Sequence, residues 1–207
     1  MTAAKWDFSV ERCALLVIDM QNDFVREDAI MEVKQAKHQL PAIKKLIDTC
    51  RKLDVPVIYT VHETDSTFNP LEIATFPHLI DAGMRAGTEG IEVVSELKPA
   101  DGEYVLSKRR YSAFYQTDLE IVLRNIHKQK KEQNVLPVDT LIICGTVTNI
   151  CCESTARDAY FRDYKVIFGS DVCSALNKEA HDATLANMEL FGQVLDCEEI
   201  IAKLEVD

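Results

Sequence analysis

Short apolar runs alternate with helix-like segments along the whole chain, and this alternation is the strongest constraint on its fold. Runs with the length and composition of strands lie at residues 13–19, 55–61, 103–107, 140–144, 165–168 and 193–195. Helical patterns follow most of them, at residues 40–53, 117–127, 151–162, 178–191 and 198–204. Strands that alternate with helices form a mostly parallel sheet covered on both faces. The sequence therefore predicts an α/β fold with a mostly parallel, six-stranded sheet.

The length and composition fit one globular domain. The chain has 207 residues, of which 47% are hydrophobic and 28% charged, so it can bury a substantial core. It has no internal repeat or low-complexity segment, and we expect a single domain over residues 1–207. The formal net charge of −11 disfavours nucleic acids and anionic membranes as partners, because both need a positive protein surface.

The chain has the features of a cytoplasmic protein. Residues 1–10 are polar and lack the apolar stretch of a signal peptide, and no uncharged apolar run is long enough to span a bilayer. The seven cysteines form an odd count scattered through strand-like and helix-like segments, which is typical of proteins whose thiols stay reduced. We therefore expect a cytoplasmic location.

Three chemically complementary side chains follow three of the predicted strands. Asp19 ends the first strand, Lys108 follows the third, and Cys151 lies beyond the fourth, where the chain turns into a helix. The carboxyl ends of parallel strands meet at one edge of a sheet, where ligands bind in such folds. A thiol nucleophile requires a base and nearby positive charge, which Asp19 and Lys108 supply. The helix N-terminus should also bias the Cys151 thiol toward the thiolate.

The segments around these residues resemble the signature motifs of one enzyme family. Residues 19–24 are Asp-Met-Gln-Asn-Asp-Phe, residues 108–114 are Lys-Arg-Arg-Tyr-Ser-Ala-Phe, and residues 145–151 are Gly-Thr-Val-Thr-Asn-Ile-Cys. In this order and spacing they are similar to the motifs of the isochorismatase-like cysteine hydrolases over nearly the whole chain. The resemblance implies a Rossmann-like, three-layer α/β/α sandwich. It also implies a catalytic triad of Asp19, Lys108 and Cys151.

The same resemblance implies how an oxyanion would be held. The family carries a non-proline cis peptide before the nucleophile, which here would join Thr146 to Val147. This bond would turn the Val147 N–H toward the site beside the Cys151 N–H, and two such donors form an oxyanion hole. The neighbouring Cys152 stands where the family has a small apolar residue, so we expect it to pack in the core. A vicinal redox pair with Cys151 is the alternative.

Four further residues are candidates for the substrate pocket. Arg110 would clamp a substrate carboxylate through paired hydrogen bonds, with a helix-cap or interface role as the alternative. Tyr111 follows it, and Phe24 and Phe114 would line the pocket wall unless they belong to the core. The segment 62–90 shows little periodicity and is expected to be a lid or an oligomer contact. The resemblance further implies a homo-oligomer, a dimer or a tetramer.

The resemblance also narrows the chemistry. Isochorismatases proper, which cleave a vinyl ether, usually lack the cysteine at the nucleophile position, so Cys151 favours amide hydrolysis. Nicotinamidases carry an Asp-x-His metal motif after the second strand, whereas this chain has Thr60 two residues before His62. The nearby acidic residues and His78 offer only weak ligand spacing. We therefore expect no catalytic metal and no organic cofactor.

Residues 148–158 look closest to the ureidoacrylate and biuret hydrolase branch, whose members cut C–N bonds in carbamoyl or ureido compounds. The resulting hypothesis is a cysteine-dependent hydrolase of a small amide or ureido compound that acts through an acyl-enzyme. A nicotinamidase-like, metal-assisted amidase and a non-catalytic or redox-sensing protein with the same fold are the alternatives. Within this segment, Glu153 and Arg157 have the spacing of a surface ion pair. Farther along the chain, we expect His181 to make a structural hydrogen bond.

Overall fold

A six-stranded parallel sheet forms the centre of the computed structural model, which describes residues 6–80, 82–126 and 137–206. Its strands are β1 (Cys13–Ile18), β2 (Val57–His62), β3 (Tyr104–Lys108), β4 (Thr140–Thr146), β5 (Lys165–Ser174) and β6 (Gln193–Leu195). Their order across the sheet is β3-β2-β1-β4-β5-β6, and each neighbouring pair is parallel. The chain winds outward from β1 to β3 and then crosses back to β4, so the direction of winding switches between β1 and β4. The predicted α/β fold is confirmed.

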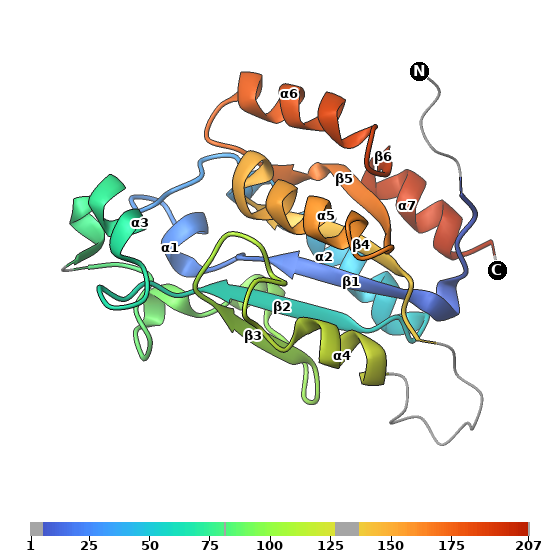
Figure 1. Ribbon diagram of the computed structural model, residues 1–207. Helices are drawn as coiled ribbons and strands as arrows, with labels where there is room; N and C mark the ends of the chain where they lie inside the picture. The colour runs from blue at the N-terminus through green and yellow to red at the C-terminus, as the bar shows by residue number, and fades with distance from the viewer. Residues whose placement is uncertain (1–5, 81, 127–136, 207) are drawn as a thin grey trace.

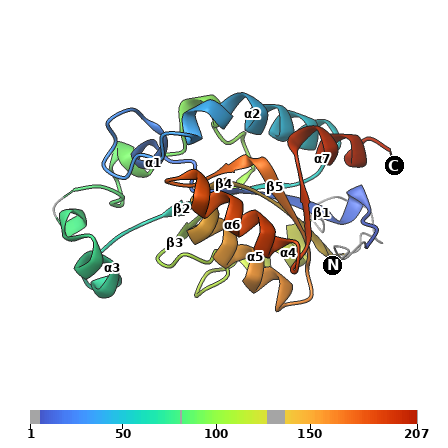
Figure 2. The same ribbon diagram turned by 90° about the horizontal axis from the view of Figure 1, so that it is seen from above.

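Helices cover both faces of the sheet (Figures 1 and 2). One face carries α2 (Ala36–Lys52) and α7 (Cys197–Leu204), and the other carries α4 (Leu119–Asn125), α5 (Glu153–Tyr160) and α6 (Lys178–Met188). Successive side chains of a strand point to opposite faces. β1 therefore contributes Leu15 and Val17 to the core under α2, and Leu16 and Ile18 to the core under α5. The result is the expected three-layer sandwich.

Burial on both faces explains why β1 is a continuous apolar run in the sequence. In α2, by contrast, the buried residues recur at helical spacing, at Leu40, Ile43, Leu46, Ile47 and Cys50. This helix begins at Ala36, earlier than the sequence predicts. We expected Pro41 in the first turn of this helix, but it lies inside the helix.

β5 is longer than the apolar run 165–168 indicates. The ladder between β4 and β5 shifts register after Ile143 and resumes with Gly145 opposite Cys173 and Thr146 opposite Ser174. The irregularity hides the second half of the strand from a periodicity analysis, because the residues at the shift are polar or small. It also carries β4 as far as Thr146, next to the candidate nucleophile.

The segment 62–90 is more structured than its sequence indicates. It contains α3 (Pro70–Thr75), which starts with a proline in its first turn, and a 3₁₀ turn at Pro77–Ile80. α3 lies beyond the carboxyl ends of β1 and β2, at the left of Figure 1. The other short elements are α1 (Asn22–Val25) and 3₁₀ turns at Val10–Arg12, Glu89–Ile91 and Ser95–Leu97.

Two helix starts also differ from the sequence-based expectation. The predicted helix from residue 151 begins as a π-helical turn, Thr148–Cys152, which continues into α5. The N-cap of α4 is Asp118 and not Thr117, whose hydroxyl accepts a hydrogen bond from the Leu119 N–H at 3.3 Å. The predicted end of this helix at residue 127 and the polar run 128–134 lie outside the described residues.

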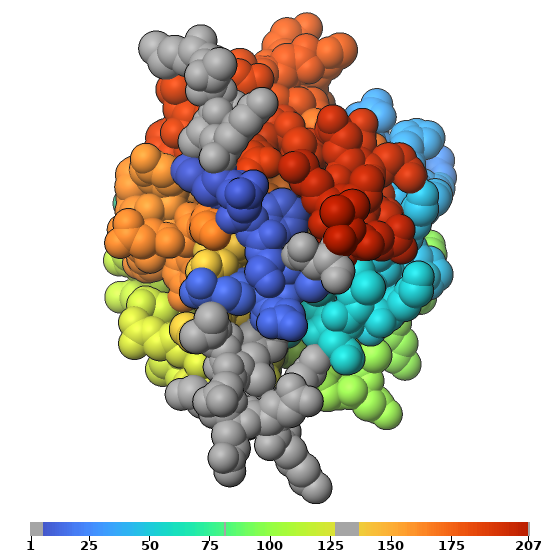
Figure 3. All heavy atoms as spheres, turned by 90° about the vertical axis from the view of Figure 1, so that its right-hand side faces the viewer, coloured from blue at the N-terminus to red at the C-terminus, as the bar shows by residue number. Residues whose placement is uncertain are grey.

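Both described ends of the chain lie at the end of the sheet remote from α3 (Figures 1 and 3). The first described residues run past α7, and the Gln193 amide donates to the Trp6 carbonyl at 2.8 Å. Within the described residues, no helix combines the length and apolarity needed to cross a bilayer. The connections that follow β1, β2, β3 and β4 lie at the carboxyl end of the sheet.

At Gly145, where β4 passes β1, there is no room for a side chain. The φ of this glycine is +121°, and a Cβ built there would lie 2.0 Å from the Ile18 carbonyl oxygen. Only glycine relieves both constraints, so this position fixes how β4 passes β1 just before the nucleophile turn.

The Gly145→Ala substitution should therefore destabilise the protein by about 2–5 kcal/mol, since it combines backbone strain with a steric clash. Gly102→Ala is a matched control, because Gly102 has φ +90° but open space around its Cβ position. This control should cost only the backbone term, about 1–2 kcal/mol. Urea unfolding midpoints of the two variants measure the difference, and equal losses would contradict the role assigned to the Ile18 contact.

Candidate active site

The three residues predicted to form a triad lie together beyond the carboxyl ends of the strands. Asp19 directly follows β1, Lys108 is the last residue of β3, and Cys151 lies in the π-helical turn after β4. The Lys108 Nζ is 2.7 Å from the Asp19 Oδ2 and 3.4 Å from the Cys151 Sγ. Because β2 separates β3 from β1, the long lysine side chain crosses the end of β2 to make these contacts. All three side chains are buried.

Hydrogen bonds to β2 and β4, the strands on either side of β1, hold Asp19 in place. The Thr60 hydroxyl donates to the Asp19 Oδ1 at 2.6 Å, and the Asp19 N–H points at the Thr60 carbonyl oxygen at 3.2 Å. The Thr146 hydroxyl donates to the Asp19 carbonyl at 2.9 Å. One carboxylate oxygen is thus fixed by Thr60 while the other faces Lys108. Sequence analysis noted Thr60 only as a departure from a metal motif and missed this role.

Lys108 is a buried cation with several partners. Besides Asp19 and Cys151, its Nζ lies 3.2 Å from the Arg110 carbonyl oxygen and 3.4 Å from the His62 Nδ1. Burial opposes the charge, but the Asp19 carboxylate and the Cys151 sulfur outweigh it and raise the pKa of Lys108 above its ordinary value. The lysine is therefore an ammonium at neutral pH.

Cys151 is a neutral thiol in the resting site. Burial raises the pKa of the Cys151 thiol well above its usual value, and the Asp19 carboxylate raises it further, against the lowering effect of Lys108. The expectation that a helix start would favour the thiolate is therefore wrong for the resting protein. The thiol needs a base to become a nucleophile, and Asp19 is the carboxylate beside it.

His62 and Glu72 extend the polar cluster toward α3. The His62 Nε2 lies 2.8 Å and 3.0 Å from the two oxygens of the Glu72 carboxylate. Burial would raise the pKa of Glu72, but the hydrogen bond from His62 outweighs it and keeps that pKa below its ordinary value. The Asn69 amide donates to Glu72 at 3.0 Å and to the Arg109 carbonyl at 2.8 Å. Sequence analysis missed Glu72 and Asn69, because no periodicity marks α3.

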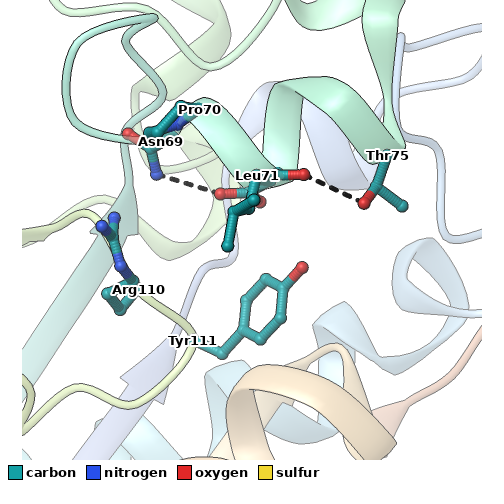
Figure 4. A pocket seen from close by; sticks show the side chains of 7 residues that line it. Asn69, Pro70, Leu71, Thr75, Arg110 and Tyr111 are labelled. Atoms are coloured by element: carbon teal, nitrogen blue, oxygen red, sulfur yellow. Dashed lines mark hydrogen bonds between the residues drawn. The ribbon is translucent and has the colours of Figure 1, made fainter.

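A pocket of about 300 Å³ opens between α3 and the segment after β3. Figure 4 shows its lining, in which Arg110 and Tyr111 lie across from the side chains of α3. The Tyr111 ring is 6.0 Å from the His62 ring, centroid to centroid, so the pocket adjoins the polar cluster. Two of the four residues proposed for substrate contact, Arg110 and Tyr111, are therefore on its wall.

Phe24 and Phe114 do not line this pocket. Phe24 is buried in the core on the α2 side of the sheet. Phe114 is buried in the other core, 5.8 Å from the Tyr164 ring and with the Arg162 guanidinium 4.9 Å from its own ring centroid. Both side chains therefore belong to the core, which is the alternative that the sequence left open for them.

Other expected contacts are present. The Arg157 guanidinium pairs with Glu153 at 2.6 Å, and the two nitrogens of His181 lie 3.0 Å from the Thr148 hydroxyl and the Ser170 carbonyl. Cys152 is buried in the core on the α5 side, as a packing residue would be. The peptide between residues 146 and 147 is cis.

No group of three or more His, Cys, Asp or Glu side chains is placed to hold a metal ion within residues 6–80, 82–126 and 137–206. At the position where nicotinamidases place a metal-binding histidine, His62 contacts the Glu72 carboxylate and Lys108.

Comparison with known proteins places this geometry in one family. The family model of the isochorismatase domain matches residues 13–199. The chain belongs to the isochorismatase family. The motif resemblance is thereby confirmed.

Among its relatives, Nicotinamidase 3 of Arabidopsis thaliana is 32% identical over 95% of this chain and 90% of the plant protein. The ureidoacrylate amidohydrolase RutB of Pantoea ananatis is 28% identical over 89% of this chain and 78% of its own length. The crystal structure of a cysteine hydrolase from Pseudomonas syringae superposes with a TM-score of 0.89 at 30% identity, over 98% of this chain and 97% of that one.

The charges around Cys151 predict how its titration responds to substitution. In Asp19→Asn a negative charge beside the sulfur is lost, so the pKa of Cys151 should fall. Lys108→Met removes the opposing positive charge and should raise it. The rate of Cys151 alkylation by iodoacetamide, followed against pH by peptide mass spectrometry, reports these shifts. An unchanged or higher midpoint in folded Asp19→Asn would contradict the assigned electrostatics.

Proposed function

We propose that this protein is a cysteine-dependent hydrolase that cleaves a C–N bond in a small amide, ureido or carbamoyl compound through an acyl-enzyme. The observation that carries the proposal is the contact of one buried ammonium, that of Lys108, with both the Asp19 carboxylate and the Cys151 sulfur. A thiol attacks a carbonyl more readily when a base takes its proton and when positive charge or N–H donors stabilise the oxyanion. Membership of the isochorismatase family and the similarity to RutB support the same reaction class.

The first half of the reaction forms the acyl-enzyme. Asp19 accepts the thiol proton as the Cys151 sulfur attacks the carbonyl carbon, so a C–S bond forms and the carbonyl oxygen becomes an oxyanion. Lys108 and the N–H groups of Val147 and Cys151 stabilise that charge. The C–N bond then breaks, and the proton held by Asp19 passes to the leaving nitrogen, which departs as ammonia or an amine.

The second half returns the enzyme to its resting state. Asp19 takes a proton from a water molecule, whose oxygen attacks the thioester carbonyl. The C–S bond breaks, the acid product leaves, and the proton on Asp19 returns to the sulfur. The net change is hydrolysis of one C–N bond by one water molecule, with no oxidant or reductant.

The pocket wall indicates which substrates to test. Its volume of about 300 Å³ suits a molecule of a few heavy atoms. Arg110 offers a guanidinium fork for a carboxylate or carbonyl oxygen, and Tyr111 offers an aromatic face beside His62. Ureidoacrylate, biuret, N-carbamoyl amino acids and maleamate offer such carbonyl oxygens, with or without a carboxylate.

A panel of these compounds with ammonia release as the readout tests the function. We expect turnover of at least one of them by the wild-type protein and a loss of about 10⁴-fold or more in Cys151→Ala, because no acyl-enzyme can form. Circular dichroism establishes that the variant folds. Full turnover by folded Cys151→Ala on a verified substrate would refute the mechanism.

The similarity to Nicotinamidase 3 makes a nicotinamidase-like, metal-assisted amidase the second candidate. It predicts that nicotinamide is turned over and that activity is lost on dialysis against EDTA and restored by a divalent metal. Since Thr60 stands where that class has a metal-binding aspartate, we expect activity on any substrate of the panel to survive EDTA. Activity that depends on added zinc, manganese or iron would favour the second candidate.

A further inference from the structure

The Lys108 ammonium has more polar neighbours than it has protons. Its nitrogen lies 2.7 Å from the Asp19 Oδ2, 3.2 Å from the Arg110 carbonyl oxygen, and 3.4 Å from both the His62 Nδ1 and the Cys151 Sγ. An ammonium offers three N–H groups and no acceptor. Four partners thus share three N–H groups, and each of them helps to fix where the nitrogen lies relative to the Cys151 sulfur.

The surroundings of His62 decide its tautomer. Its Nδ1 faces the Lys108 ammonium, which can only donate, so the Nδ1 must be an acceptor without a proton. Its Nε2 faces both oxygens of the Glu72 carboxylate, which can only accept, so the Nε2 carries the proton. The imidazole is thus neutral and oriented, with an acceptor toward the cation and a donor toward the anion.

His62 and Glu72 are anchored independently of Lys108. The Gln21 side chain accepts from the His62 N–H at 2.7 Å and donates to its carbonyl at 3.0 Å. Glu72 is further held by Asn69, which is itself buried and tied to the chain after β3. Gln21 thus holds the backbone of His62 and Glu72 holds its ring, both without a contribution from Lys108.

We propose that His62 and Glu72 are positioning residues that fix the direction of the Lys108 ammonium between Asp19 and Cys151. The inference rests on the proposed function, in which that ammonium stabilises the oxyanion. His62 takes one N–H of Lys108, and Glu72 holds the ring in the orientation that keeps the Nδ1 lone pair aimed at it. The Glu72 charge also attracts the ammonium from behind the ring without competing with Asp19 for contact.

This arrangement connects the pocket wall to the catalytic cation. Glu72 belongs to α3, whose side chains line the pocket together with Arg110 and Tyr111. A substrate that presses on α3 therefore acts on the same carboxylate that orients His62. The lysine and the wall that receives the substrate are set by one chain of hydrogen bonds.

Two substitutions of His62 separate positioning from simple anchoring. His62→Asn places an acceptor near the position of the Nδ1 but loses the contact with Glu72. His62→Gln retains a donor near the position of the Nε2, toward Glu72, but loses the acceptor for Lys108. If His62 orients Lys108, the kcat of His62→Gln should fall at least about tenfold below that of His62→Asn. Its KM should stay near the wild-type value, because the link to α3 persists.

A role limited to holding α3 in place predicts the opposite order. His62→Asn would then be the more damaged variant, mainly through a higher KM, and that result would overturn the proposal. Thermal unfolding and circular dichroism establish that both variants fold. Glu72→Gln should show a smaller kcat loss of the same kind. Glu63→Gln changes a neighbouring, partly buried carboxylate that pairs with Ser107 and Arg109 and not with His62, and it should leave kcat within about threefold.

Alkylation of Cys151 by iodoacetamide provides a readout that needs no substrate. An ammonium no longer held beside the sulfur lowers the thiol pKa less, so the midpoint of the alkylation profile should move upward in His62→Gln and remain near the wild-type value in His62→Asn. Equal midpoints in all three proteins would refute the proposal. If the wild-type protein hydrolyses nothing in the panel but the midpoints shift as expected, the proposed hydrolase function fails and the positioning of Lys108 stands.

Discussion

The buried ion pair between Lys108 and Asp19 is the interaction on which the rest of the site depends. A buried ammonium or carboxylate is costly unless it is paired and its remaining polar atoms are satisfied. Here the partners come from β3 and β1, which are not neighbours in the sheet, so the pair forms only when β2 lies between them in the correct register. Thr60 and His62, both from β2, then provide hydrogen-bond partners for the Asp19 Oδ1 and for the Lys108 ammonium.

The same burial sets the chemistry of Cys151. A low-dielectric site disfavours a third charge, so the resting state holds one cation, one anion and a neutral thiol. In the proposed attack, the proton moves to Asp19 and the negative charge moves to the substrate oxygen. The net charge of the site stays constant through the step, and the cation that stabilised the carboxylate now stabilises the oxyanion. Protein dipoles and charges already in place need little reorganisation.

The sequence was sufficient to predict the sheet and the meeting of Asp19, Lys108 and Cys151, for a simple reason. Asp19, Lys108 and Cys151 each follow an apolar strand, and parallel strands bring their carboxyl ends to one edge. The burial of Phe24 and Phe114 in the core could not be predicted in this way, since an aromatic residue after a motif is compatible with a core position and with a pocket wall. The pKa of Cys151 depends on depth of burial, and the contacts of Glu72 depend on tertiary packing of a segment without periodicity. None of these has a local signal.

The strands and the connections between them also differ in what they contribute to the proposed site. The three proposed catalytic residues lie at the ends of β1 and β3 and in the turn after β4, positions that the ladders of the sheet determine. The pocket wall is carried by α3 and the residues after Lys108, which belong to no ladder. A change in α3 can therefore alter the shape and charge of the pocket while the triad keeps its geometry, which is how one scaffold supports different substrates. Glu72 is the exception, because it serves the wall and the cation together, so its replacement should not be neutral for catalysis.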